Sequence, residues 1–535
     1  MKLRRCVLSV AFVAVGVVPG VSSASAATLC VGGAPGCFAT IQEAVDAAGD
    51  GDRIVVDPGT FDGGITIDDV DVRLVGAGPD QTVIRGGGPV VTIGTFGAAD
   101  EPTVSIRGVR ITGGVTRTSP ESVPFTGKEG VFAAGGGIEI PPNADFSGGA
   151  TVKVNDSVID GNRVAPSDTV PSGLPCPGGV DCPFAFAGGG GIDSWGTLTL
   201  IDSTVRNNSV GSASGLSTLA SDSDGGGIVS QLAPLRLVGA DVRGNQATAT
   251  GPFGRFAEGG GIFVDGTALT LRESSVSGNV GALAGTLPNS VDQLAIGGGI
   301  QIGGNVATAR ISDTKIVSNS VGATNSVANA SAFSGGMNTA DIHLDLRTKN
   351  VVIARNEVTV AALNPSHGDA EGDTGGASLL DKSAGLRLID NTVTVRSRAG
   401  DATAAAGGGF GNGLLVDAVM NFNSAHASSP NGTALAVGGA FVADARLTLR
   451  RATIRANTAS AAGEDGAARG GGIFDGRLFS DGGPLTLIDS SVTQNVATGP
   501  PRISLQGGGL YIHHNRSTLI NSSLEANSPD QCFGC

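Results

Sequence analysis

The chain has 535 residues, of which 87 are glycine, only 4% are aromatic and 15% are charged. One Trp and one Tyr cannot supply the large rings of several compact cores, so the composition argues against a row of ordinary globular domains. The formal net charge of −14 argues against nucleic acid as a partner, and against polyanionic polysaccharide unless calcium bridges the two.

Residues 1–26 have the pattern of an export signal. Lys2, Arg4 and Arg5 precede an apolar run over 7–18, and the cleavage pattern Ala-Ser-Ala ends at residue 26. The apolar run is too short to span a membrane, and no later stretch is apolar enough. We therefore expect a secreted or cell-surface protein that does not span the membrane after the signal is removed.

Residues 27–53 are predicted to form an N-terminal cap. The segment "ATIQEAVDAAGDGDRIVVDPGTF" at 39–61 contains Thr40 as a helix N-cap and Glu43 as its capping-box partner. The apolar side chains of Ile41, Ala44 and Val45 share one helical face, which can cover the first unit of a repeat protein.

Residues 54–535 are built from a repeat, which is clear in "AGGGGIDSWGTLTLIDSTVRNNSV" at 187–210. Its frame is three glycines and an apolar residue, then L-x-L-x-[DNE]-x-x-[VI]-x-x-N, recurring about every 36 residues. One copy between Asn356 and Asn423 is expected to carry Arg396 in place of the final Asn. The final Asn residues of the frame are Asn162, Asn208, Asn245, Asn279, Asn319, Asn356, Asn423, Asn457, Asn495 and Asn527.

The repeat predicts an all-β fold, a right-handed parallel β-helix of about 13 coils with a short N-terminal capping helix. Apolar and polar residues alternate in each copy, as in strands, and no copy has room for an amphipathic helix. A propeller would need four strands per blade and usually carries aromatic signatures. In a β-helix the Asn side chains would stack ~4.8 Å apart as a hydrogen-bonded ladder, with a left-handed backbone at that corner.

From each Asn to the next glycines the length varies, which predicts one variable loop per coil on a constant scaffold. The longest loops are expected at 115–134 and 163–187. Loops that stack on one side can carry binding specificity, although these lack Tyr and Trp.

Six cysteines follow the signal segment, in three pairs that are close in sequence. Export makes disulfides permissible, and proximity favours pairing within each pair, although fifteen connectivities are open. The expected pairs are Cys30 with Cys37, Cys176 with Cys182, and Cys532 with Cys535.

No metal or cofactor site is predicted. The segment from Gly188 to Gly196 matches a calcium-binding nonapeptide once, with Asp193, but such a site needs tandem copies. An acidic position recurs in the frame at 156, 202, 273, 313, 390, 417 and 489, and it is best interpreted as a turn residue because Gly239 and Arg451 also occupy it.

The best polar constellation is "ADIHLDLRTKN" at 340–350. Asp341, His343, Asp345 and Arg347 alternate with apolar residues, so a strand would place all four on one face. They are the candidate catalytic residues, and a solvated outer face is the alternative. His513 and His514 are adjacent, so a strand points them to opposite faces.

The segment "TIQEAVDAAGDGDRIVVDPGTFDGGITI", followed by "VRLVGAGPDQTVIRGG", resembles the opening coils of pectin lyase-like β-helix proteins. The glycine and x-x-N frame is similar to the repeats of polymorphic outer-membrane proteins, with Val or Ile in place of Phe. The resemblance covers nearly the whole mature chain and implies the fold, whereas the superfamily includes lyases, hydrolases, esterases, adhesins and non-catalytic rods. The catalytic motifs of its pectinesterase-like and polygalacturonase-like branches are absent from the sequence.

These observations favour an exported, non-catalytic scaffold or adhesin-like binder of the bacterial surface or extracellular space. The alternative is a polysaccharide lyase or glycoside hydrolase with its site on the outer face of the β-helix. A cell-envelope rod that self-associates is a third possibility. A glycan or a surface protein is the expected partner, and the oligomeric state is left open.

Overall fold

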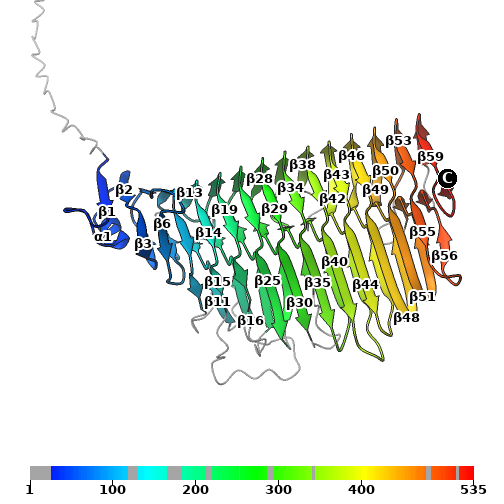
Figure 1. The fold of residues 1–535 in the computed structure, drawn as a ribbon, viewed down its shortest axis with the longest axis horizontal. Helices are drawn as coiled ribbons and strands as arrows, with labels where there is room; N and C mark the ends of the chain where they lie inside the picture. The colour runs from blue at the N-terminus through cyan, green and yellow to red at the C-terminus, as the bar shows by residue number, and fades with distance from the viewer. Residues whose placement is uncertain are drawn as a thin grey trace, which may run out of the picture.

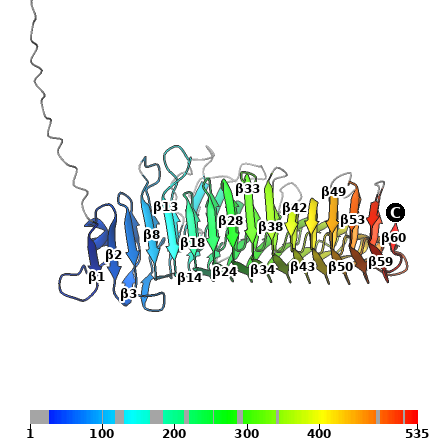
Figure 2. The ribbon, with the colours of Figure 1, turned by 90° about the horizontal axis from the view of Figure 1, so that it is seen from above.

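A computed structural model describes residues 26–99, 101–117, 130–165, 184–211, 220–251, 254–285, 294–339, 344–476, 483–513 and 517–535. They form a rod with the first residues at one end and the last at the other (Figures 1 and 2). The fold is a right-handed parallel β-helix, as predicted, and the ladders between its described strands are parallel. Among the described residues no helix is long and apolar enough to cross a membrane.

The predicted cap contains the helix α1 (Ile41–Asp46). Thr40 accepts a hydrogen bond from the backbone N–H of Glu43, whose carboxylate accepts one from the N–H of Thr40. The apolar face of the helix, Ile41, Ala44 and Val45, is buried against the first coils. Strand β1 (Thr28–Val31) pairs with β2 (Asp52–Val56) and joins the cap to the rod.

One coil, taken from residue 192, shows how the three sheets arise. Its strands β17 and β18 belong to a 26-stranded sheet, β19 to a 14-stranded sheet, and β20 and β21 to a 20-stranded sheet. Their bounds are Ile192–Ser194, Leu198–Ile201, Thr204–Arg206, Ser209–Val210 and Ala220–Asp224. The 14-stranded sheet runs from β3 (Gly59–Asp62) to β59 (Ser523–Glu525), so it has one strand more than the thirteen coils expected.

The prediction of a variable loop after each Asn is corrected where the structure describes these segments, because the chain there forms strands. Residues 118–129 and 166–183, within the two longest expected loops, lie outside the described residues. The chain runs outward along one strand of the 20-stranded sheet and returns along another, and the two layers pack face to face as a fin along the rod (lower half of Figure 1). Outward strands include β25 (Gln246–Gly251) and β40 (Glu357–Ala362), and return strands include β26 (Gly254–Glu258) and β41 (Ala370–Asp373). Nearer the C-terminal end, outward and return paths form single long strands, β48 (Ser424–Val437) and β51 (Thr458–Arg469).

The fin and the body of the rod have different cores. The body encloses Ile, Leu and Val side chains such as Ile192, Leu198 and Val205, all fully buried. The fin encloses mainly Ala with some Val, such as Ala323, Val360 and Ala404. Small buried residues alternate with Ser and Thr in the fin, so the segment lacks the large apolar residues that mark a strand in sequence.

Fin and body meet at a narrow waist, which the Asn ladder fills. Asn245 Nδ2 donates to Asn279 Oδ1 of the next coil at 3.0 Å and to the carbonyl of Val205 in the preceding coil at 3.0 Å. Its own Oδ1 accepts from the N–H and the Nδ2 of Asn208, both at 3.0 Å. The same pattern links consecutive coils from Asn162 to Asn527.

Two expectations about this corner are corrected. The ladder position between Asn356 and Asn423 is held by Asn391, whereas Arg396 lies on the outer face of the fin. The reason is a shorter segment between glycines and Asn: Asn391 comes 15 residues after Gly376, whereas Asn356 comes 20 residues after Gly336. The left-handed residue is the one before each ladder Asn, for example Asn207 with φ 53°, so Asp390 belongs to this corner and not to the column of turn acids. The other acids of that column, such as Asp202 and Asp313, do adopt the left-handed turn conformation.

The glycines are needed at the waist because the backbone passes directly over the ladder. A Cβ on Gly261 would lie 2.6 Å from the carbonyl oxygen of Gly299 and 2.8 Å from Asn279 Nδ2. The first position of this corner has positive φ, which glycine adopts easily, for example 57° at Gly259, although Ser334, Thr374 and Ala406 hold it in three coils. The glycines and the Asn recur together because the glycine backbone packs directly on the Asn side chain.

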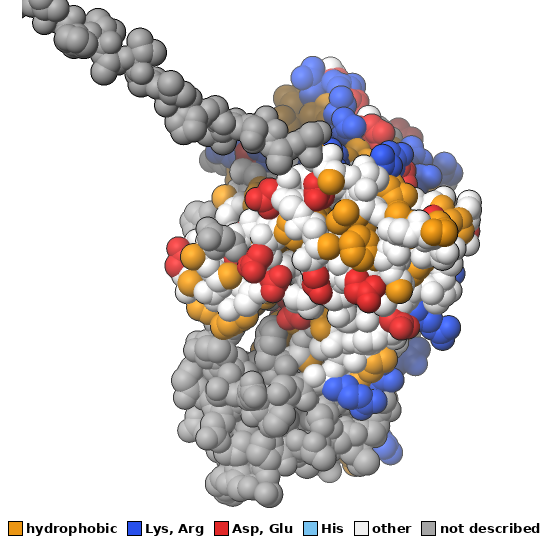
Figure 3. Space-filling model, turned by 90° about the vertical axis from the view of Figure 1, so that its left-hand side faces the viewer, with side chains coloured by type: hydrophobic (Ala, Val, Ile, Leu, Met, Phe, Trp, Pro, Cys, Tyr) orange, Lys and Arg blue, Asp and Glu red, His pale blue; other side chains and the backbone are white. Residues whose placement is uncertain are grey.

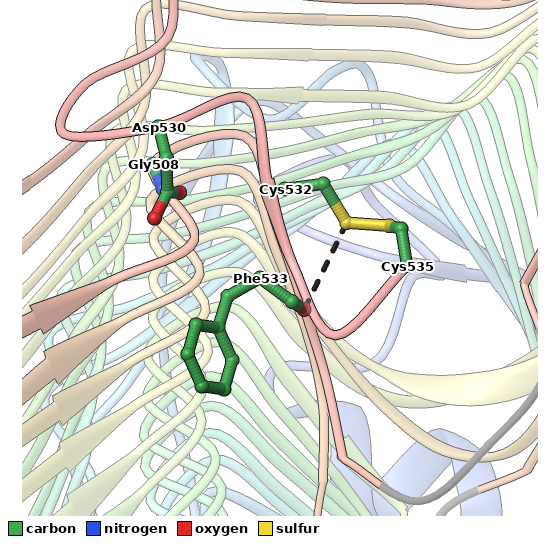
Figure 4. Close-up of a disulfide and its surroundings, with 5 residues drawn as sticks. All are labelled: Gly508, Asp530, Cys532, Phe533 and Cys535. Carbon is green, nitrogen blue, oxygen red and sulfur yellow. Dashed lines mark hydrogen bonds between the residues drawn. A yellow bond between two sulfur atoms is a disulfide. The ribbon is translucent and has the colours of Figure 1, made fainter.

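Two disulfides close the ends of the chain, Cys30–Cys37 beside the cap and Cys532–Cys535 in the last residues (Figure 4). Near the second, Asp530 accepts a hydrogen bond from the N–H of Gly508 at 3.1 Å and holds the end of the chain on the last glycine corner. Cys176 and Cys182 lie outside the described residues.

Replacing Asn245 by Ala should lower the free energy of unfolding by about 2–4 kcal/mol, because buried donors and acceptors on both neighbouring coils lose their hydrogen-bond partner. Denaturant unfolding measures this. The matched control is Gln246→Ala, one residue further on at an exposed position, which should change stability little. Equal stability of the two variants would contradict the ladder's role.

Replacing Gly261 by Ala should destabilise the chain by at least about 1–3 kcal/mol, because the backbone has to move to admit a methyl group. Gly304→Ala is the control, since a Cβ there meets nothing within 4 Å. Thermal unfolding of both variants distinguishes the close approach at the waist from a general cost of losing glycine.

Candidate functional site

The predicted constellation at 340–350 is only partly described. Asp341 and His343 lie outside the described residues, whereas Asp345 and Arg347 lie on β38 (Asp345–Lys349). Asp345 accepts hydrogen bonds from Arg347 Nε at 3.1 Å and from a terminal nitrogen of Arg310 at 2.7 Å. These two arginines hold the pKa of Asp345 below its usual range, so the carboxylate is an ionised surface acceptor rather than a proton donor.

The pair His513 and His514 is also only partly described. His513 stacks on Tyr511 with ring centroids 6.3 Å apart, and His514 lies outside the described residues. Among the described residues no group of three or more His, Cys, Asp or Glu side chains is arranged to hold a metal ion.

We call the junction between fin and body the seam. Along it, the side chain directly before the glycines of one coil lies opposite the side chain two residues after the glycines. In the coils around Asn338 it is filled by amides and hydroxyls that satisfy one another: Asn338 donates to Gln301 at 2.8 Å and accepts from Ser378 at 2.7 Å. Towards the C-terminal end it is filled by rings, with Phe474, Tyr511 and Phe533 stacked 5.1 and 5.2 Å apart.

Towards the N-terminal end the same seam contains carboxylates. Glu139 on β12 (Ile138–Ile140) is the Cα partner of Asp193 on β17, one coil further along. Asp224 at the end of β21 is likewise the partner of Glu258 at the end of β26. The members of this acidic cluster are Glu139, Asp193, Asp222, Asp224, Glu258 and Asp265.

Burial keeps protons on much of this cluster. It raises the pKa of Glu139 to about 7 and that of Glu258 to about 7, with Asp265 adding repulsion at Glu258. Burial also raises the pKa of Asp193 well above its usual value, with a smaller contribution from Glu139. The pKa of Asp224 is raised in the same way, by burial first and then by the neighbouring carboxylates, Glu258 foremost.

The two deepest members have unused oxygens. Asp193 is 1% exposed and Asp224 is 6% exposed, and one carboxyl oxygen of each, Oδ1, has no hydrogen-bond partner. The other oxygen of Asp193 accepts from the indole N–H of Trp195 at 3.1 Å. Buried carboxyl groups without a cation or a full set of donors are costly, and they concentrate at functional sites.

Asp265, at the end of β27 (Ile262–Asp265), has the opposite environment. Its two oxygens accept from the backbone N–H of Asn305 at 3.0 Å and from the side-chain amide of Asn305 at 2.8 Å. Glu258 and Asp265 are both half-buried, so solvent reaches these two carboxyl groups of the cluster.

The sequence analysis missed the cluster because its members come from four different coils and none is conspicuous alone. A signal was nevertheless present in "DGGGIVSQL" and "EGGGIFVDG", where an acid directly precedes the glycines. Aligning the coils on their glycines places Asp224 and Glu258 directly before the glycines and Glu139 and Asp193 two residues after them. These two positions line the same seam.

The N-terminal end of the rod is also acidic (Figure 3). A hollow of about 450 Å³ there is lined by Asp46, Asp50, Asp68 and Asp69. Asp50 accepts a hydrogen bond from the N–H of Asp71, as turn residues do. The side chains of this face are largely exposed, and it is a solvated surface rather than a site.

No protein-family model and no curated protein matches the chain. Among solved structures it is similar to the A-module of mannuronan C-5 epimerase AlgE4 of Azotobacter vinelandii, with 11% identity over 91% of each chain and a TM-score of 0.25. It is also similar to the AlgE6 A-module of that organism, with 13% identity over 91% of this chain and 93% of the other, and a TM-score of 0.24. The relation to pectin lyase-like proteins and to polymorphic outer-membrane repeats stays a prediction.

The raised pKa values of Glu139 and Glu258 make stability depend on pH. Between the unfolded pKa near 4.5 and the folded pKa of about 7, the folded chain binds more protons than the unfolded chain, so stability falls as pH rises through this window. The melting temperature should therefore be higher at pH 5 than at pH 8. Glu139→Gln should flatten this dependence, whereas an equally steep slope in the variant would contradict the assignment.

Proposed function

We propose that the chain is an exported glycoside hydrolase that acts on an uncharged extracellular polysaccharide, with the acidic cluster as its catalytic centre. The observation that carries the proposal is the pair Glu258 and Asp265: burial raises the pKa of Glu258 to about 7, and both oxygens of Asp265 accept hydrogen bonds from Asn305. Hydrolysis of a glycosidic bond needs such a pair: a carboxylic acid to protonate the leaving oxygen and a carboxylate on the other side of the bond.

The roles follow from the surroundings of each group. Glu258, with a pKa of about 7, is protonated in a large fraction of molecules at neutral pH and is the general acid. Asp265, whose two oxygens are oriented by the hydrogen bonds from Asn305, is the nucleophile or the base that activates water. Asp224 lies beside Glu258 and is too buried to touch a substrate, so its place is to shield Glu258 from water.

The same cluster supports a hydrolase better than a lyase. A lyase that acts on uronic acids needs a cation to neutralise the substrate carboxylate, and the described residues of the cluster include no Arg, Lys or His. Repulsion by the carboxylates also disfavours a polyanionic glycan. The second candidate is the non-catalytic binder expected from sequence, which the near-complete burial of Asp193 and Asp224 favours.

The test is release of reducing ends from a panel of neutral polysaccharides by the purified chain. Glu258→Gln and Asp265→Asn should each lower kcat by about 100-fold or more, because each removes one of the two groups that transfer protons or charge. Activity should fall as pH rises past about 7, when Glu258 loses its proton.

The matched control is Glu357→Gln, at an exposed position on the outer face of the fin, which should leave activity unchanged. Binding of a glycan without cleavage would overturn the hydrolase and favour the non-catalytic binder. Full activity in both cluster variants would overturn the assignment of the centre.

A further inference from the structure

Three aromatic side chains lie in contact on consecutive coils beside the acidic cluster. Phe96 and Phe146 have ring centroids 5.9 Å apart, and Phe146 and Trp195 6.5 Å apart, each pair meeting edge to face. Each ring follows the first strand of its coil: β7 (Val91–Ile93), β12 and β17. The row therefore runs along the rod axis and not around it.

The row faces solvent although it is apolar. Phe96 is 51% exposed, and Phe146 and Trp195 are half-buried. Phe146 also has a φ of 53°, which is unfavourable for a residue with a large side chain. The turn that carries it is held by hydrogen bonds from Ser147 to Asn143 and Asp145, so local structure maintains a conformation that places a ring at the surface.

The row is joined to the acidic cluster by a hydrogen bond. The indole N–H of Trp195 donates to Asp193 at 3.1 Å, and the two side chains project from the same face because they are two residues apart. Glu139, on the coil that carries Phe146, is the strand partner of Asp193. Glu258 and Asp265 lie two coils further along, ~10 Å away at the spacing of parallel strands.

We infer that Phe96, Phe146 and Trp195 form a sugar-binding subsite, which takes the apolar ring faces of an uncharged polysaccharide and leads its chain to the acidic cluster. Aromatic side chains pack against the apolar faces of pyranose rings, and the indole of Trp combines an apolar ring with a polar N–H at a partly solvated surface. Glu139, which is only partly buried, adjoins the row and can hydrogen-bond to sugar hydroxyls, and the net charge of −14 disfavours anionic sugars. The choice of an uncharged polysaccharide as the ligand rests on the proposed function, whereas the aromatic row itself does not.

The experiment uses the fact that Trp195 is the single tryptophan of the chain. Its fluorescence is titrated with neutral hexasaccharides, such as those of β-linked glucose, mannose and xylose, and with an oligogalacturonate of the same length. At least one neutral hexasaccharide should change the emission saturably, and the oligogalacturonate should not.

Phe96→Ala should then weaken binding of that hexasaccharide by about 10-fold, which corresponds to about 1.4 kcal/mol. Phe422→Ala is the matched control, because Phe422 is also exposed, at 57%, but lies at a corner of the 14-stranded sheet. Phe146→Leu keeps an apolar side chain without a ring and should weaken binding as well.

The inference and the proposed function fail in different ways. Binding that depends on Phe96 without any cleavage supports the subsite and overturns the hydrolase. Cleavage that depends on Glu258, with the same KM in Phe96→Ala as in the unaltered chain, overturns the subsite and supports the hydrolase. An unchanged emission with every neutral hexasaccharide, or tighter binding of oligogalacturonate, also overturns the subsite.

Discussion

The close approach of backbone and Asn side chains at the waist is the constraint on which the remaining structure depends. The glycine segment of each coil passes over the ladder at a distance that admits no Cβ, and the ladder Asn bonds to both neighbouring coils. This contact closes the body around its aliphatic core and sends the chain outward into the fin. The geometry of the seam is fixed as a result, because the residues on either side of the glycines face each other in every coil.

Within that fixed geometry the chemistry of the seam changes along the rod. Rings fill it near the C-terminal end and mutually bonded amides fill it in the middle. Near the N-terminal end, carboxyl groups take the same positions, and their burial raises several pKa values. Since apolar or paired polar residues evidently fit these positions, the carboxyl groups are not required for the fold, and this difference is the physical basis for assigning them a function.

The sequence was sufficient for the β-helix, for the capping box at Thr40 and Glu43, and for locating most of the ladder, because each depends on local pattern or on strict recurrence. It was not sufficient for the fin, whose Ala-rich interior lacks the apolar signal of ordinary strands. It also misplaced Arg396, since a shorter segment between Gly376 and Asn391 shifted the frame. The acidic cluster depends on which residues of different coils face one another, and no single copy of the repeat contains that information.

The ladder has a further consequence for how such a chain can change. Each Asn bonds only to the coils before and after it, so a duplicated or deleted coil leaves every other junction as it was. Length can therefore vary in whole units, while a partial unit would break the register of all three sheets. The same independence lets substitutions accumulate in one stretch of the seam without disturbing the rest, so a reactive segment can arise on an otherwise inert rod.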